Sequence, residues 1–171
     1  MEKSSNSNID LIYDYTADLI KSQRDSITRL DTKLSTFLAF GGLTLRFALS
    51  LHSNSLIKSL ESLPEMLCLI FKILSCGLAL CCVIICGIGL TAKMRGITVD
   101  PKELMKDELF NRKEETNKGY IVSGWIKITD EYEMLGKEKG EDLNLAIIFI
   151  ILSIVAVSIN IITDAVFIEK A

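Results

Sequence analysis

The fold of this chain is decided by three apolar stretches, the last of which reads LNLAIIFIILSIVAVSINIITDAVF, residues 143–167. The other two are MLCLIFKILSCGLALCCVIICGIGLTA, residues 66–92, and LSTFLAFGGLTLRFALSL, residues 34–51. A helix of about 20 apolar residues, rising about 1.5 Å per residue, matches a bilayer hydrocarbon core of about 30 Å. We therefore expect an all-α integral membrane protein with three transmembrane helices and a cytoplasmic helical bundle.

The composition agrees with this class because the charged residues are separated from the apolar stretches. Of the 171 residues, 49% are hydrophobic and 24% are charged, and nearly all the charged ones lie in residues 1–33 and 93–142. The net charge of −3 gives no reason to expect nucleic-acid binding. The polar first segment lacks the short basic start and immediate apolar stretch of a signal peptide, so the first span is expected to be an uncleaved anchor.

The basic residues predict the orientation of the chain. Residues 1–33 and 93–142 hold fifteen Lys and Arg, whereas the loop 53–65 and the tail 168–171 hold two. The positive-inside rule then places the N-terminus in the cytoplasm and the C-terminus outside a bacterial inner membrane. The predicted order is cytoplasmic helix 1–33, transmembrane helix 34–52, outer loop 53–65, transmembrane helix 66–92, cytoplasmic helical segment 93–142, transmembrane helix 143–167 and outer tail 168–171.

Both cytoplasmic segments are predicted to be amphipathic helices. Asn8 is the expected N-cap of the first, which has no Gly or Pro before Gly41 and should continue into the first span. Asp100 and Pro101 form a typical start for the second. Steps of three and four keep one face of the first helix apolar or neutral. That face comprises Ile9, Ile12, Thr16, Ile20, Gln23, Ile27, Leu30 and Leu34.

The second cytoplasmic segment carries a similar face, which we call the packing stripe. It consists of Ile121, Trp125, Ile128, Tyr132 and Leu135. This stripe either packs against the first helix within one monomer or forms a coiled-coil-like oligomerising stalk. Gly136 and Gly140 flank a charged turn just before the third span, and they predict a hinge or break there.

Charged side chains inside a membrane are costly, so they are the first functional candidates in such a chain. The predicted intramembrane polar cluster is Arg46, Lys72, Asn160 and Asp164. At about 1.5 Å per residue, all four are expected within roughly 5–12 Å of the outer membrane surface. In one interpretation the cations extend to the outer headgroups and Asp164 is interfacial. In the other, Asp164 and Asn160 neutralise a cation inside the bundle, or the cations line a pore that favours anions.

Each member of this cluster lies on the least apolar stripe of its helix. The span-one stripe is Ser35, Ala39, Gly42, Arg46 and Ser50; the span-two stripe is Cys68, Lys72, Ser75, Ala79, Cys82, Cys86 and Gly89; the span-three stripe is Ala146, Phe149, Ser153, Ala156, Asn160 and Asp164. Small residues on one face let helices approach closely in lipid. We therefore expect the three stripes to meet, within one subunit or between subunits, with the charges at the outer end.

Catalytic and metal-binding patterns are absent from the sequence. All five cysteines lie in the second span, and the only histidine is His52, so the ligand set of a metal site is missing. The cysteines are best explained as small packing residues. No phosphate-binding glycine loop, HExxH or GxSxG motif occurs. We expect no enzymatic activity, no metal and no cofactor.

The residues Arg29-Leu30-Asp31-Thr32-Lys33-Leu34-Ser35 end a cytoplasmic helix and lead directly into a span that contains Gly41-Gly42. This Asp31-x-Lys33 motif resembles the start of the transmembrane effector modules of bacterial cyclic-nucleotide antiphage systems, the Pycsar-type membrane effectors. The layout of spans and charged segment is also similar. The resemblance implies an effector that oligomerises and damages the inner membrane when triggered. This chain lacks a separate β-rich nucleotide-binding domain, so a partner would have to sense the ligand.

These observations lead to two functional hypotheses. The first is a small homo-oligomeric membrane protein that permeabilises or perturbs the inner membrane, as a candidate antiviral defence effector. The second is a structural or accessory membrane subunit whose cytoplasmic helices dock a partner protein. In either case Lys33 is expected to anchor in anionic headgroups. Asp31 is expected to pair with Arg29, Lys33 or a basic residue of 93–142.

Overall fold

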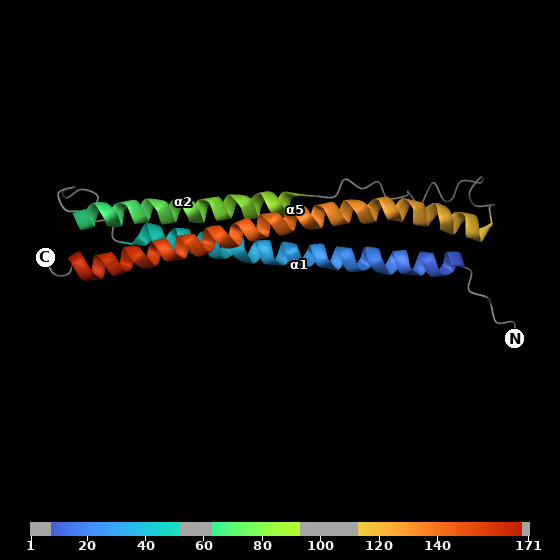
Figure 1. Cartoon of the computed structure of the whole chain (residues 1–171), viewed down its shortest axis with the longest axis horizontal. Helices are drawn as coiled ribbons and strands as arrows, with labels where there is room; N and C mark the ends of the chain where they lie inside the picture. Colours follow the sequence, from blue (N-terminus) through green and yellow to red (C-terminus); the bar gives the residue numbers. More distant parts are fainter. Residues whose placement is uncertain (1–7, 52–62, 93–112, 169–171) are drawn as a thin grey trace. The chain divides into compact units, whose positions relative to one another are not determined.

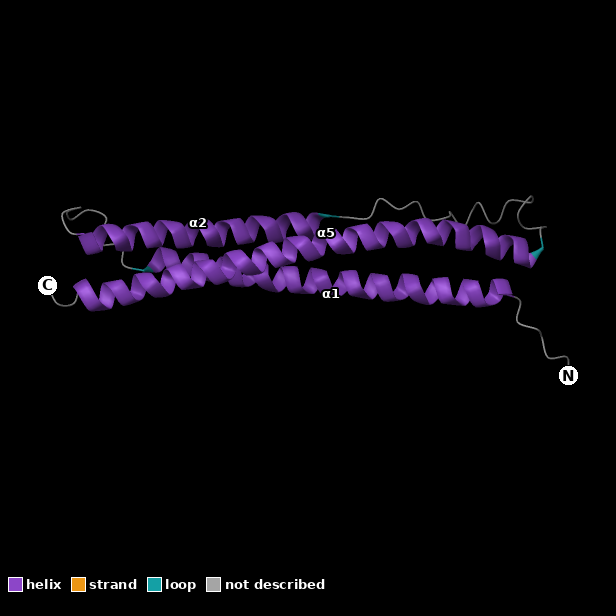
Figure 2. Cartoon of the chain, in the orientation of Figure 1, coloured by secondary structure: helices purple, strands orange, loops and turns teal. Residues whose placement is uncertain are grey.

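The computed structural model describes residues 8–51, 63–92 and 113–168, and these residues contain no β-strand. They form α1 (Asn8–Ser50), α2 (Leu63–Thr91) and α5 (Glu114–Thr163), which continues as a single π-helical turn, η2 (Asp164–Ile168) (Figures 1 and 2). The predicted all-α class is therefore confirmed. The expected helix start at Asp100 and Pro101 lies outside the described residues, as does most of the expected outer loop.

Helix α1 begins at Asn8, the residue expected to cap it, and continues without interruption into the apolar stretch. The threonine hydroxyls in that stretch donate hydrogen bonds to carbonyls of the same helix. The Thr36 hydroxyl donates to the Thr32 carbonyl at 2.8 Å, and the Thr44 hydroxyl donates to the Phe40 carbonyl at 2.9 Å. Because each hydroxyl has a partner on its own helix, α1 can present these residues to an apolar environment without an unpaired donor.

Helix α5 runs unbroken through Gly136 and Gly140, so the predicted interruption there is wrong. Each glycine in a helix interior costs only about 1 kcal/mol relative to alanine. Packing on both sides offsets this cost, because Leu135 and Leu143 are buried and Lys139, between the two glycines, is almost completely buried. A break at these glycines was predicted because the sequence pattern does not include the burial of their neighbours.

The chain forms two compact units. Unit 1 comprises Met1–Leu30 and Ala92–Glu138, and unit 2 comprises Asp31–Thr91 and Lys139–Ala171. Unit 1 contains the polar parts of α1 and α5, whereas unit 2 contains all three apolar stretches.

In unit 2, α2 lies antiparallel to both other helices (Figure 1). A Cβ atom on Gly89 would lie 3.0 Å from the Leu34 side chain, and one on Gly41 would lie 3.5 Å from Cys82 Sγ. The buried side chains are mostly small, and those on α2 follow each other at steps of three and four. They are Leu34 and Ala48 on α1, Ser75, Ala79, Cys82 and Cys86 on α2, and Leu143, Ala146, Ile150, Ser153, Ala156, Val157 and Asn160 on α5.

In unit 1, α1 and α5 pack through one aromatic pair and one ion pair. The rings of Tyr13 and Trp125 are tilted by 39° with centroids 4.7 Å apart, a favourable aromatic geometry. The ammonium of Lys118 lies 2.6 Å from the Asp10 carboxylate. The periodicity of α1 predicted that Ile12 faces inward, but Ile12 is exposed and its neighbour Tyr13 makes the contact.

Two helices are long and apolar enough to cross a membrane. These are Met66–Thr91, with a mean hydropathy of 2.6, and Glu114–Val166, whose apolar part reaches 3.0. Helix α1 is not among them within the described residues. The physical reason lies in its apolar part, which is diluted by Arg46 and by several Ser, Thr and Gly residues.

Candidate functional site: polar groups of the apolar helices

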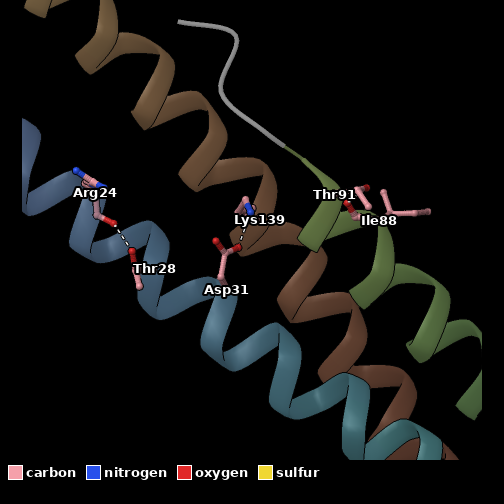
Figure 3. A network of polar contacts seen from close by, with 6 residues as sticks. All are labelled: Arg24, Thr28, Asp31, Ile88, Thr91 and Lys139. Carbon is pink, nitrogen blue, oxygen red and sulfur yellow. Dashed lines mark hydrogen bonds and ion pairs between the residues drawn. The ribbon is translucent and has the colours of Figure 1, made fainter.

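A buried ion pair joins α1 and α5 at the start of their apolar stretches. The Lys139 ammonium donates to Oδ1 of Asp31 (Figure 3). The Lys139 side chain is 2% exposed and that of Asp31 is 41% exposed. A lysine is almost never fully buried unless it is paired, so this carboxylate is what permits the ammonium to lie inside the bundle.

Among the partners considered for Asp31, the structure selects a basic residue of 93–142. Lys33, the other residue of the Asp31-x-Lys33 motif, is not part of this ion pair, and its side chain is exposed on α1. Lys139 was not singled out from the sequence, although a signal was present. It follows Leu135 by four residues and precedes Leu143 by four, so it continues the rhythm of the packing stripe.

The span-two and span-three stripes meet inside unit 2, whereas the span-one stripe does not join them. On α2 and α5 every stripe residue is buried or half-buried. All five residues of the span-one stripe are exposed within the chain: Ser35, Ala39, Gly42, Arg46 and Ser50. Helix α1 instead turns Leu34, Gly41 and Ala48 toward its neighbours, a seven-residue repeat that the choice of small residues alone did not reveal.

Two side-chain hydrogen bonds hold the stripes of α2 and α5 together. The buried Ser153 hydroxyl donates to the Ser75 carbonyl at 2.9 Å. About two helical turns further along α5, the Asn160 amide donates to the Cys68 carbonyl at 3.1 Å. Hydrogen bonds between helices in lipid each contribute about 0.6 kcal/mol and at most about 1.7 kcal/mol. The hydrogen bond of Asn160 therefore joins α2 and α5 rather than Asn160 and a cation.

Lys72 binds the end of α1. Its ammonium donates to the main-chain carbonyl of Leu51, just after the last helical residue, Ser50. The last carbonyls of a helix have no partner within the helix and carry partial negative charge, so a cation there satisfies both a hydrogen bond and the helix dipole. This contact was not among the roles predicted for Lys72, which were headgroup binding, neutralisation by Asp164 and Asn160, and lining a pore.

Arg46 lies level with the middle of the uncharged stretch of α5, residues 143–163. Lys72 on α2 contacts the carbonyl of Leu51 at the end of α1. Arg46 precedes Leu51 by five residues. Because α1 and α2 are antiparallel, the residue of α2 level with Arg46 is five residues after Lys72, namely Gly77. Gly77 is two residues beyond Ser75, whose carbonyl is bound by Ser153. Arg46 is exposed, and it makes no ion pair or side-chain hydrogen bond with any residue that the structure describes.

At this level Arg46 lies far along the bundle from both carboxylates that flank the apolar stretch of α5. The stretch of α5 between Asp142 and Asp164 carries no charge, and Ser153 lies at its centre. At about 1.5 Å per residue, Arg46 is about 13 Å or more from the level of either carboxylate. The distance of Arg46 from the outer membrane surface stays a prediction.

The predicted cluster of charges at one end is therefore not assembled within the chain. Asp164 begins the π-helical turn η2 and is half-buried, and among the described residues no ion pair joins it to Arg46 or Lys72. The four polar residues are spread along the helix axes, each with a different environment. Only Lys72 and Asn160 have partners that explain their burial.

The packing stripe contacts α1 of the same chain through the ring of Trp125, which packs on Tyr13. Two helical turns earlier on α5, Lys118 forms an ion pair with Asp10 of α1. Ile128 and Leu135 are buried, and Ile121 and Tyr132 are half-buried. Hydrogen bonds from Lys118 to Asp10 and then to Glu114 raise the pKa of its ammonium above the ordinary lysine value. Because this ion pair is near the surface, it contributes little to stability.

Within the residues that the structure describes, no cluster of His, Cys, Asp and Glu is arranged to hold a metal ion. The five cysteines are free thiols, of which Cys82 and Cys86 are buried in the helix interface. Comparisons with protein-family models, with curated proteins and with solved structures found no match to this chain.

Proposed function

We propose that this chain is an integral membrane protein with three helical spans, whose copies assemble and permeabilise the bacterial inner membrane. The observation that carries the membrane assignment is the apolar surface of unit 2. Leu43 on α1, Ile73 on α2 and Ile162 on α5 are each more than 60% exposed. Only 28% and 33% of the apolar segments of α2 and α5 are buried, far less than in the core helix of a soluble protein.

The first span is included on physical grounds. Its helix is continuous, its threonine hydroxyls are satisfied by its own carbonyls, and Phe40 and Phe47 are exposed beside Leu43. These aromatic and aliphatic side chains form a lipid-compatible face, and Arg46 is the only charge in the stretch. An exposed arginine in lipid is costly, which favours an arrangement in which further copies of the chain cover it.

The role of a defence effector rests on the resemblance of the Asp31-x-Lys33 region and of the layout to Pycsar-type membrane effectors. The orientation places residues 1–33 and 93–142, which hold fifteen Lys and Arg, on the cytoplasmic side and the C-terminus outside, and it rests on the positive-inside rule. No catalytic or cofactor chemistry is required for this activity, because opening a membrane needs only assembly of the spans.

The proposal is tested by inducing the chain in a bacterium and following a membrane-potential dye, with and without phage infection. We expect depolarisation that depends on membrane insertion. A matched control is the Gly41→Leu variant, which keeps the apolar stretches but crowds the contact of α1 with α2. This variant should insert and leave the potential intact. Normal insertion of the unmodified chain with no depolarisation in either condition would contradict the proposal.

A second function is favoured by one observation in unit 1. Leu11 and Tyr15, one turn apart on α1, are 69% and 68% exposed although they lie in the polar part of the chain. An exposed apolar pair outside the membrane is typical of a surface that binds a protein. The alternative is therefore an accessory membrane subunit whose cytoplasmic helices dock a partner. A stoichiometric partner that co-purifies with the chain and with Asp18→Asn, but not with Leu11→Ser/Tyr15→Ser, would favour this function.

A further inference from the structure

Three cations of unit 2, Lys139, Lys72 and Arg46, differ in whether an acidic group or a carbonyl binds them. Lys139 is neutralised by Asp31, and Lys72 binds the carbonyl at the end of α1. Arg46 has neither kind of contact among the described residues, and its side chain is exposed on the outer face of α1. An arginine cannot lose its charge at physiological pH, so burial in lipid cannot be relieved by deprotonation.

The level of Arg46 restricts how its charge is neutralised. It lies level with the centre of the uncharged stretch of α5, about 13 Å or more along the axis from Asp142 and from Asp164. Copies of the chain inserted in the same orientation hold equivalent residues at the same depth. A neighbouring copy therefore brings its own Arg46 to this level and neither of those carboxylates. Because no carboxylate of the residues that the structure describes lies at this level, we take water and a dissolved anion as the source of compensation.

The backbone near Arg46 leaves room for such a neighbour. A Cβ atom on Gly42 or on Gly77 would meet no atom within 4 Å, and both glycines are exposed. Gly77 is level with Arg46, and Gly42 lies one turn from it on the same face of α1. A face with small residues permits close helix approach, while the arginine at its centre requires a wet environment.

We propose that copies of this chain surround a water-filled path lined by Arg46, and that this path conducts small inorganic anions such as chloride in preference to cations. The inference rests on the proposed function, because it specifies which ions cross the permeabilised membrane. A ring of fixed positive charge inside a narrow low-dielectric path concentrates anions and excludes cations. Lys72, which is bound to a carbonyl, does not contribute to this selectivity.

The test is the chloride-to-potassium permeability ratio of the full-length protein in liposomes, measured under a KCl gradient. In the unmodified chain we expect a ratio of about tenfold in favour of chloride. Arg46→Gln should bring the ratio close to one, and Arg46→Glu should invert it. Lys72→Gln is the matched control, since it removes another cation from the apolar part of unit 2 and should leave the ratio unchanged.

Before its permeability ratio is interpreted, each variant is shown to be assembled by its particle mass and helical content in nanodiscs. If Arg46→Glu does not assemble, the milder substitution Arg46→Gln carries the test. Conductance with the same ratio in the unmodified chain and in Arg46→Gln would overturn this inference and leave the proposed function intact. Assembled, inserted protein without any conductance would overturn both. An equal change of ratio in Lys72→Gln would also overturn the assignment to Arg46.

Discussion

Replacing Asp31 by Asn is expected to destabilise the fold by about 3 kcal/mol. The substitution leaves the ammonium of Lys139, which is 2% exposed, without a countercharge inside the bundle. Breaking a buried ion pair from one side costs about 3–5 kcal/mol, and the lower end applies because the Asp31 side chain is partly solvated. The measurement is the fraction of protein that survives heating in detergent, followed by size-exclusion chromatography with detection of the Trp125 fluorescence.

The controls distinguish the ion pair from a general loss of negative charge. Glu141→Gln removes an exposed carboxylate of the same unit and should leave the heat resistance unchanged. Lys139→Met removes the buried charge itself and should cost less than Asp31→Asn, because Asp31 remains partly hydrated. Combining the two substitutions should restore most of the loss caused by Asp31→Asn alone, as expected for coupled residues. An Asp31→Asn protein as heat-resistant as the Glu141→Gln control would show that the buried lysine needs no carboxylate.

Gly41→Leu is expected to have the second large effect, a loss of about 1–3 kcal/mol in stability. A Cβ atom at this position would already lie 3.0 Å from the side chain of Val83 and 3.7 Å from the carbonyl of Ala79. A leucine must therefore push α1 away from α2, because the backbone carbonyl cannot rotate aside. The separation should also weaken the contact of Lys72 with the end of α1.

The adjacent glycine provides the control for this substitution. Gly42→Leu adds the same side chain and the same gain in helix propensity, but its Cβ atom meets nothing within 4 Å. In detergent, at a dilution where light scattering detects monomers, Gly42→Leu should retain the thermal midpoint of the unmodified chain while Gly41→Leu should lose several degrees. Equal midpoints for the two variants would contradict the close α1–α2 contact.

Much of the helical architecture was predictable from residue patterns. The helical character of 9–34 follows from its apolar steps of three and four, and the continuity of α1 follows from the absence of Gly and Pro before Gly41. The facing stripes of α2 and α5 were predictable because small residues recur on one side of each helix. The interruption at Gly136 and Gly140 was predicted wrongly, because local propensity was outweighed by tertiary packing.

The candidate site was less predictable, because it depends on which residues face one another. Sequence spacing indicated that Asp31 needs a basic partner, but several were available. It also grouped Arg46 with Lys72 and Asp164, whereas the structure puts them at different levels along the helices. Their level depends on where α1 ends relative to α5, and that offset is a property of the packed bundle rather than of any single helix.

By itself, the sequence determined the helical class, the three apolar stretches and the separation of charge from them, because these depend on composition and local periodicity. Only the tertiary structure decided that Lys139 is the partner of Asp31, that Lys72 binds the end of α1, and that Arg46 is exposed without a partner. Those outcomes depend on helix register and rotation. Both are set by the close packing of small residues such as Gly41 and Gly89, which fixes how far each helix slides along the next.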